Sequence, residues 1–407
     1  MRLSILLLPL AILSAPANAE PGLPDEATVN SALDAHPSVL AARARVNAAR
    51  ADARARAKGP NEFVFSGSYI RRTVDYEGGY DEYDGQISRP IRLPGKARLD
   101  RDIGAYGIEA AENMAEDAKH QAALLLIGHW WDWLGAAAEA RVDAQAVTNY
   151  EKALAAMKRR AELRDASQLD VDQTAAALGT ARVMAAESAG RANLARARLA
   201  AHFPGLSIPG QPVDVPQPQL PAGGLERYRD LVLSNSHEIA AADAAAHRMD
   251  SIAERARREK LADPSLGIRM FSERGGAERG AGVVFSIPLG GGHRSALADQ
   301  AAADAGAAQA EASLARYNVL ETADGDLAEA TFRFTAWQRA REGLDAQMAA
   351  LQKQRRGHDL GEIDLSDLLL GERMVHDAFR NEAMARTDAM RAITKLRIDS
   401  HELWLTD

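Results

Sequence analysis

Two long stretches of the chain carry apolar residues at steps of three and four. The first runs from Gly95 to about Asp165 without a proline. The second carries the apolar residues Leu327, Phe334, Trp337, Leu344, Met348 and Leu351. This spacing lines the apolar side chains along one side of a helix. At ~1.5 Å per residue the first helix would be about 100 Å long. One long helix cannot bury its own apolar side, so each is expected to fold back on the next, at 167–202 and 363–403.

Short segments before each long stretch alternate between apolar and polar residues. Tyr83, Gly85 and Ile87 alternate with polar positions, and 281–287 shows the same period of two. The pattern predicts strand pairs at about 63–89 and about 266–287, each closed by a charged, glycine-rich loop. Alternation over so few residues also fits two ordinary hairpins of a soluble α+β protein.

The two halves of the chain repeat one order of elements. The segment 36–57 resembles 236–257, and each half then gives strand, loop, strand, long helix, turn and helix. The repeats span 20–202 and 225–407, and Asp170 aligns with Asp367. Six prolines between them, in 203–224, exclude a helix and favour an extended linker.

The composition limits the location and the partners of the protein. Residues 1–19 combine Arg2, an apolar run and a small-residue cleavage site, which predicts a secretory signal peptide. The chain has no cysteine for a disulfide or a lipid anchor. The formal net charge of −8 argues against nucleic acid as a partner.

Four strands per chain could not stand alone in a membrane. Open strand edges are costly in lipid, and four strands are too few for a barrel. A location in the outer membrane therefore requires several chains to share one barrel. A trimer would supply twelve strands, and the same axis would gather twelve helices into a tube.

Three motifs carry a family resemblance: HPSVLAARARV at 36–46, LPGK at 93–96 and GEIDLSDLL at 361–369. With the repeat, they make the mature chain resemble the TolC-like outer-membrane factors, closest to the CzcC-like metal-resistance branch. The resemblance implies a mainly α protein with a small β part, and a homotrimer with a twelve-stranded transmembrane barrel in outer-membrane lipid. Its coiled-coil hairpins would form a tunnel through the periplasm.

The resemblance also implies the function and the partners. The chain would be the passive exit duct of a tripartite efflux system, with a periplasmic adaptor and an inner-membrane pump of the RND type. Metal cations are favoured as cargo by the LPGK motif. The lipidated cysteine of many relatives is missing, and Arg164 stands where the second tip has Gly361.

No motif predicts chemistry. The glycine that a phosphate loop needs before Gly95 is replaced by Pro90, and the histidines lack zinc-ligand spacing. We therefore expect no enzyme, no cofactor and no bound metal.

The hairpin turns are expected to hold the functional residues. Asp170 and Asp172 lie near the first turn, and Asp364 and Asp367 near the second. Three copies around an axis would form a ring of carboxylates that favours cations and whose members raise one another's pKa. The alternative is that these residues cap the following helices. Leu360, Gly361, Leu365 and Leu368 are candidate adaptor contacts, or they are buried between the helices.

The joints from strand to long helix are the last candidates. Pro90 and Pro288 would end strands, and Pro94 with Gly95 would allow the turn into the helix. Lys96, Arg98 and Arg101 are expected to meet anionic headgroups. The competing hypothesis is a soluble periplasmic coiled-coil adaptor or scaffold. Adaptors typically have one hairpin, whereas this chain predicts two.

Overall fold

The computed structural model describes residues 20–221 and 223–405, so the predicted signal peptide lies outside the described residues. The chain is mainly helical with one four-stranded sheet. The elements of the first half are α1 (Glu26–Asp34), α2 (Pro37–Lys58), β1 (Val64–Val74), β2 (Gly78–Pro90), α3 (Lys96–Glu162) and α4 (Gln168–His202). Those of the second half are α5 (Glu226–Ser234), α6 (His237–Glu259), β3 (Ser265–Glu273), η1 (Arg274–Gly276), β4 (Glu278–Ser286), α7 (Gly292–Asp359) and α8 (Leu365–Asp399).

The predicted repeat is confirmed in the order of the elements. Each half gives a short helix, a second helix, a strand pair, a very long helix and a return helix. The long helices have 67 and 68 residues, and both return helices have 35. The short helices α1 and α5 were not predicted. Both are nine residues long, and residues of each, such as Leu33 and Val232, are buried.

The chain forms two compact units that do not coincide with the repeats. Within the described residues, one unit consists of the segment up to His36, the segment from Ala123 to Leu225 and the segment from Asp326 onward. The other consists of Pro37–Ala122 and Glu226–Gly325. Each unit thus draws equivalent segments from both halves, and α3 and α7 each contribute to both units. We call them the hairpin unit and the sheet unit.

In the sheet unit, alanine allows helices to pack closely. Ala42 and Val46 of α2 are buried against Ala115 of α3. In the second half, α6 packs on α7 in the same way, through two clusters made almost entirely of alanine. Small side chains let helix backbones approach, which explains the unusual alanine content of these segments.

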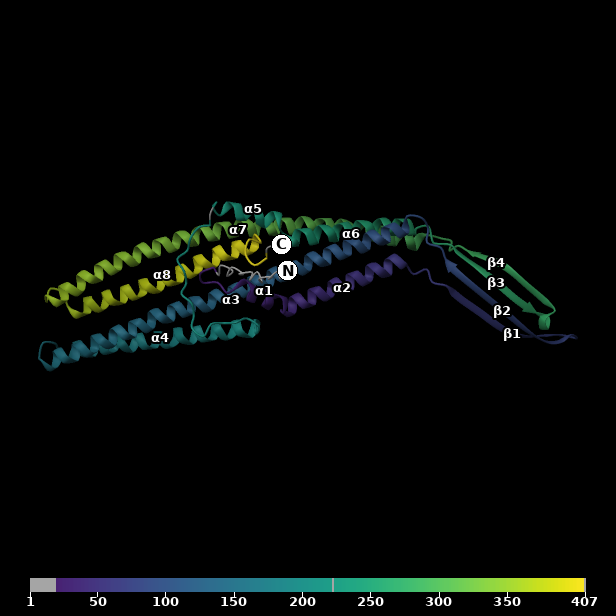
Figure 1. The fold of residues 1–407 in the computed structure, drawn as a ribbon. Helices are drawn as coiled ribbons and strands as arrows, with labels where there is room; N and C mark the ends of the chain where they lie inside the picture. The colour runs from purple at the N-terminus through teal and green to yellow at the C-terminus, as the bar shows by residue number, and fades with distance from the viewer. Residues whose placement is uncertain (1–19, 222, 406–407) are drawn as a thin grey trace, which may run out of the picture. The chain divides into compact units, whose positions relative to one another are not determined.

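In the hairpin unit, α4 folds back along α3, and α8 folds back along α7 (Figure 1). Trp130, Trp131 and Trp133 are at most 2% exposed, so the tryptophan run of α3 belongs to the core. The Trp130 indole donates a hydrogen bond to the carbonyl of Gly22 at 2.8 Å. The proline-rich linker is extended and is fixed to this unit by buried apolar residues, among them Phe203 and Val215.

The sheet is antiparallel, with its strands in chain order (Figure 1). β1 and β4 are therefore its edges. The central pair, β2 and β3, joins the two repeats. In the described parts of the chain, no helix is both long enough and apolar enough to cross a membrane.

Candidate functional site: an amphipathic sheet, its joints and two hairpin tips

One face of the sheet is apolar across all four strands. The register places Phe65, Ile87, Ile268 and Val283 in one row. These side chains are between 47% and 77% exposed. The predicted alternation is confirmed, since Tyr83, Gly85 and Ile87 lie on this face. We call it the apolar face.

Polar groups bound the apolar face at both ends. Tyr69 and Tyr83 pack against each other in a tilted arrangement at the loop end, with ring centroids 5.3 Å apart. At the joint end, the Arg89 guanidinium lies 5.0 Å from the ring centre of Phe63. Amphipathic aromatic and basic residues at the two ends of an apolar band are typical of the two interfaces of a membrane.

The opposite face is mostly polar. Arg269 pairs with Asp84 at 2.5 Å, and Arg72 pairs with Glu82 at 2.7 Å. Ser66, Ser68, Gln86 and Ser88 lie on the same face. A sheet with one exposed apolar face and one charged face is suited to separate lipid from water.

The first joint is built by the LPGK motif. Pro90 is the last residue of β2, as predicted. The Lys96 amide donates to the Leu93 carbonyl at 3.3 Å, and Gly95 has φ +88°. Pro94 and Gly95 are therefore the central residues of a type II turn, which requires a glycine-like conformation at its third position. Pro94 precedes the helix, which begins at Lys96, and so lies outside its first turn.

Lys96 does not face lipid headgroups, so that expectation was wrong. Its side chain is 1% exposed. The ammonium Nζ donates to the Leu261 carbonyl and to Asp263 Oδ1, both at 2.8 Å, and pairs with Glu259 Oε2 at 3.0 Å. Asp263 Oδ1 also accepts the Leu93 amide at 3.0 Å. We call Lys96, Glu259, Leu261 and Asp263 the Lys96 cluster.

The Lys96 cluster joins the two repeats where β2 and β3 pair. Lys96 follows β2, and its acceptors lie at the end of α6 and just before β3. A second ionic group lies beside it, in which Asp100 accepts from Arg92 at 3.2 Å and from Arg255 at 3.0 Å. The basic character of the first joint therefore serves contacts within the chain, while Arg98 remains exposed at 81%.

The second joint has neither the turn nor the cluster. β4 ends at Ser286, two residues before Pro288, and Gly290 has φ +87°. Residues 286–293 are all exposed. Arg294 donates to the carbonyls of Lys260 and Gly290.

The two hairpin tips share one backbone design. At the first, the Asp165 amide donates to the Arg160 carbonyl at 2.8 Å, and at the second, the Glu362 amide donates to the Gly357 carbonyl at 2.9 Å. These bonds belong to a Schellman motif, in which the residue just after the helix adopts the left-handed backbone conformation. That residue is Arg164 at the first tip, with φ 61°, and Gly361 at the second, with φ 77°.

The predicted carboxylates lie at the starts of the return helices. Asp170 forms a capping box with Ser167, accepting its amide at 2.7 Å and donating its own amide to Ser167 Oγ at 3.1 Å. The bond from the Ser167 amide lowers the pKa of Asp170. Asp364 caps α8 by accepting the Asp367 amide at 3.0 Å. The aligned Asp170 and Asp367 thus both lie three residues after a cap.

The other two carboxylates are exposed. Asp172 accepts from the Gln168 side chain at 3.0 Å. Asp367 is exposed and, unlike Asp170, its side chain does not complete a capping box. The capping alternative therefore describes Asp170 and Asp364.

The four leucine and glycine candidates divide into two groups. Leu360 is 67% exposed, and Gly361 is exposed beside it. Leu365 is buried in a cluster with Met157 and Val171, and Leu368 packs against it. For Leu365 and Leu368 the structure fits the alternative, burial between the helices.

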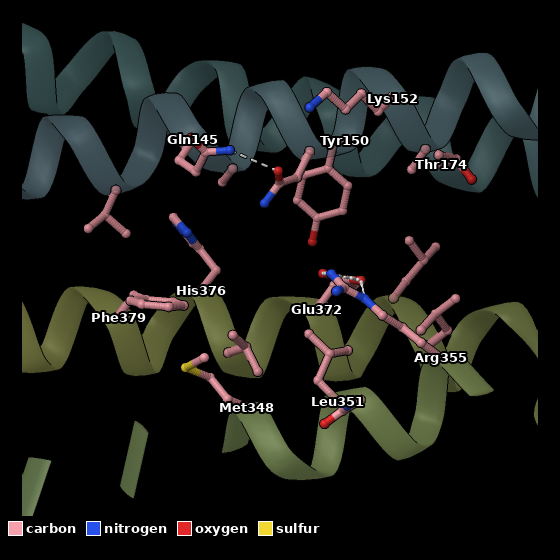
Figure 2. A pocket seen from close by; sticks show the side chains of 18 of the residues that line it. Gln145, Tyr150, Lys152, Thr174, Met348, Leu351, Arg355, Glu372, His376 and Phe379 are labelled. Atoms are coloured by element: carbon pink, nitrogen blue, oxygen red, sulfur yellow. Dashed lines mark hydrogen bonds and ion pairs between the residues drawn. The ribbon is translucent and has the colours of Figure 1, made fainter. Parts of the chain in front are cut away.

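A groove of about 1310 Å³ lies between the two hairpins (Figure 2). Tyr150 enters it from α3, and Glu372 from α8 accepts two bonds from Arg355 of α7, at 2.7 and 3.0 Å. Burial, and then the Glu372 carboxylate, raise the pKa of Tyr150. His376 Nε2 lies 3.0 Å from Oδ1 of the fully buried Asp143.

The first repeat matches a known family. Residues 28–203 match the sequence model described as "Outer membrane efflux protein". Over these residues, which make up less than half of the chain, the sequence is similar to the outer membrane efflux protein family. The match runs from α1 to the first residue of the linker.

Solved structures of similar fold cover both repeats of the chain. A membrane protein from Pseudomonas aeruginosa has a TM-score of 0.75 and 17% identity, over 92% of this chain and 89% of its own. The CmeC outer membrane channel of Campylobacter jejuni has a TM-score of 0.71 and 15% identity, over 94% and 86%. The outer membrane protein VceC of Vibrio cholerae has a TM-score of 0.71 and 17% identity, over 93% and 95%. Comparison with curated sequences gives no significant match.

Sequence reasoning missed two groups of residues in this chain. The partners of Lys96 lie more than 160 positions away, and the LPGK motif alone does not reveal them. Asp143 and His376 lie on two different hairpins and share no local motif. The one available signal was Asp143 itself, a charged residue one position from the apolar side of a long helix.

Proposed function

We propose that three copies of the chain form one outer-membrane channel, a passive duct for efflux. The observation that carries this proposal is the sheet, which exposes an apolar face on every strand and leaves both edges unpaired. An open edge in lipid leaves backbone groups without hydrogen bonds, at several kcal/mol each. Three copies would supply twelve strands and close the barrel.

A matched pair of lysine substitutions tests which face meets lipid. Ile268→Lys lies in the central row of the apolar face, and Ser68→Lys lies on the polar face beside Asp84. A lysine facing the middle of the bilayer costs about 2–4 kcal/mol, and one facing water costs little. We expect Ile268→Lys to reduce the heat-sensitive trimer in outer-membrane fractions, and Ser68→Lys to leave it unchanged. Equal effects, or a soluble wild-type monomer in periplasmic extract, would favour the scaffold hypothesis instead.

The duct requires partners at its periplasmic end. We propose that a periplasmic adaptor contacts the exposed Leu360 and Gly361, and that an inner-membrane pump of the RND type supplies the energy. The adjoining groove supports this, because apolar walls with charged borders suit a packed helix. Leu360→Asp should abolish co-purification with the adaptor while the trimer persists. Leu163→Asp at the first tip, where Leu163 is 75% exposed, is the control.

We further propose that Asp367 narrows the tunnel as a ring of three carboxylates. Its exposure and its incomplete capping role support this proposal over Asp170. Asp367→Ala is expected to raise the single-channel conductance in planar bilayers and to weaken cation preference. Asp170→Ala should instead lower helix stability. Unchanged conductance and selectivity in Asp367→Ala would remove this residue from the gate.

Metal cations are the proposed cargo, on the basis of the LPGK motif alone. A deletion strain should become more sensitive to divalent cations such as Zn²⁺ and regain resistance with the wild-type gene. Sensitivity to organic drugs and not to cations would reject this cargo and leave the duct intact.

A further inference from the structure

The two edge strands of the sheet adjoin the parts of a second contact equivalent to the Lys96 cluster. The Lys96 cluster joins the β2 joint of the first repeat to the segment before β3 of the second. The repeat implies an equivalent pair, the β4 joint and the segment before β1. Within one chain these lie at opposite edges of the sheet, so only another copy can bring them together.

The strand register identifies the equivalent residues. Continuing the β1–β2 register by two residues places Glu62 opposite Pro90. Continuing the β3–β4 register in the same way places Asp263 opposite Pro288. Glu62 is thus the counterpart of Asp263, and both are acidic.

The counterpart of Lys96 is identified by its distance along the sequence from the proline at the end of the strand. Lys96 is six residues after Pro90, and Arg294 is six residues after Pro288. Both side chains are cationic. Glu62 is exposed, and Arg294 is half-buried. Charge complementarity therefore fits a contact between two copies of this chain.

We propose that Arg294 of one protomer pairs with Glu62 of the next, and that β4 joins the neighbour's β1 in the register that β2 and β3 use within the chain. This inference rests on the proposed channel and specifies its interface. The β2–β3 register pairs Ser88 with Gly267. The equivalent pairing sets Ser286 opposite the neighbour's Ser66, and Phe285 opposite its Gly67. Apolar and polar faces then remain continuous from one protomer to the next.

The contact between protomers differs from the Lys96 cluster in two ways. Glu259 has no acidic counterpart, because α2 ends at Lys58 and Gly59 follows. The rigid Pro94–Gly95 turn has no equivalent, because α7 begins at Gly292 directly after Gly290 and Gly291. The joint between copies is thus the more adaptable of the two, and its ion pair forms only on assembly.

Cysteine pairs test the register, because the chain has no cysteine of its own. Ser66→Cys with Ser286→Cys should give disulfide-linked dimers and trimers on oxidation, seen on non-reducing gels. Directly opposed residues have Cα atoms about 4.5–5.5 Å apart, within the disulfide range. Within one chain the two positions lie three strand spacings apart and four residues out of register, about 20 Å in all, which excludes an internal bridge. The control pair, Ser68→Cys with Ser286→Cys, lies about two residues out of register and should not link.

A charge exchange tests the ion pair. Arg294→Glu should lower the temperature at which the trimer dissociates by about 5 °C, and Glu62→Arg added to it should restore that temperature. Arg98→Glu, an exposed charge of the first joint, should change little. If the trimer forms but the control cysteines link, or neither pair links, the register is wrong and the channel stands. If the unmodified protein forms no trimer, the proposed channel fails as well.

Discussion

Removing the ammonium group of Lys96 should destabilise the sheet unit strongly. Lys96→Met keeps much of the length of the side chain but leaves three acceptors without their donor. Breaking a buried ion pair from one side costs about 3–5 kcal/mol, because the remaining charge stays buried. Glu259 keeps Arg255, and Asp263 keeps the Leu93 amide. We therefore expect a loss of about 2–4 kcal/mol in the free energy of unfolding.

Urea unfolding of the purified protein, followed by circular dichroism, measures this loss. Arg98→Met is the control and should lie within about 0.5 kcal/mol of the wild type, since its pair with Asp102 is exposed. The double variant Lys96→Met with Asp263→Leu should recover part of the loss, because it removes the unpaired carboxylate. A Lys96→Met protein as stable as the control would refute the reasoning, as would a double variant weaker than the single one.

The same cluster predicts a pH dependence. Burial raises the pKa of Asp263, but the hydrogen bonds from Lys96 and Leu93 outweigh burial and lower it below its usual value. A depressed carboxyl pKa contributes stability above the unfolded pKa of about 4, and this stability is lost in more acidic solution. Without Lys96 the loss should begin at higher pH, which urea midpoints at several pH values would detect.

Three further predictions concern the hairpin unit. Arg164→Gly should stabilise the first tip by up to about 1 kcal/mol, because glycine adopts the left-handed backbone conformation without the strain that arginine has there. Gly361→Ala should destabilise the second tip for the same reason. Thermal melts of both variants measure these changes. Asp364→Ala should cost about 1 kcal/mol of stability because the helix loses its N-cap. Asp364→Ser should cost little in the same melts, because serine is the N-cap residue at the first tip, Ser167. Burial, then Asp399, raise the pKa of Asp326 to about 7 despite Lys395. Stability should therefore fall as pH rises from about 4 to 7, and Asp326→Asn should flatten that profile in melts taken across this range.

The elements of the fold were predictable because their signals are local. An uninterrupted helical pattern of nearly seventy residues and a period of two in Tyr83, Gly85 and Ile87 need no tertiary information. The repeat strengthened both predictions, since each half supports the other. The short helices α1 and α5 were not predicted, because nine residues give little periodic signal.

The candidate sites were predictable only in part, because their roles depend on distant partners. The alignment of Asp170 with Asp367 was found from the sequence, and both lie three residues after a cap. Which leucines are exposed depends on how two hairpins meet, and Leu365 therefore stayed ambiguous. Lys96 looked like a surface cation because its acceptors belong to the other repeat.

The central pairing of the sheet has a consequence for how the chain folds. Each hairpin, β1 with β2 and β3 with β4, closes over a few residues and can form early. Lys96 and Asp263 are separated by 167 positions, and contacts over such distances form slowly because a long loop must be ordered first. The two hairpins should therefore exist before they join, each with an unpaired edge and an exposed apolar face. Such intermediates tend to aggregate, so we expect the newly made chain to depend on a chaperone until Lys96 reaches its acceptors.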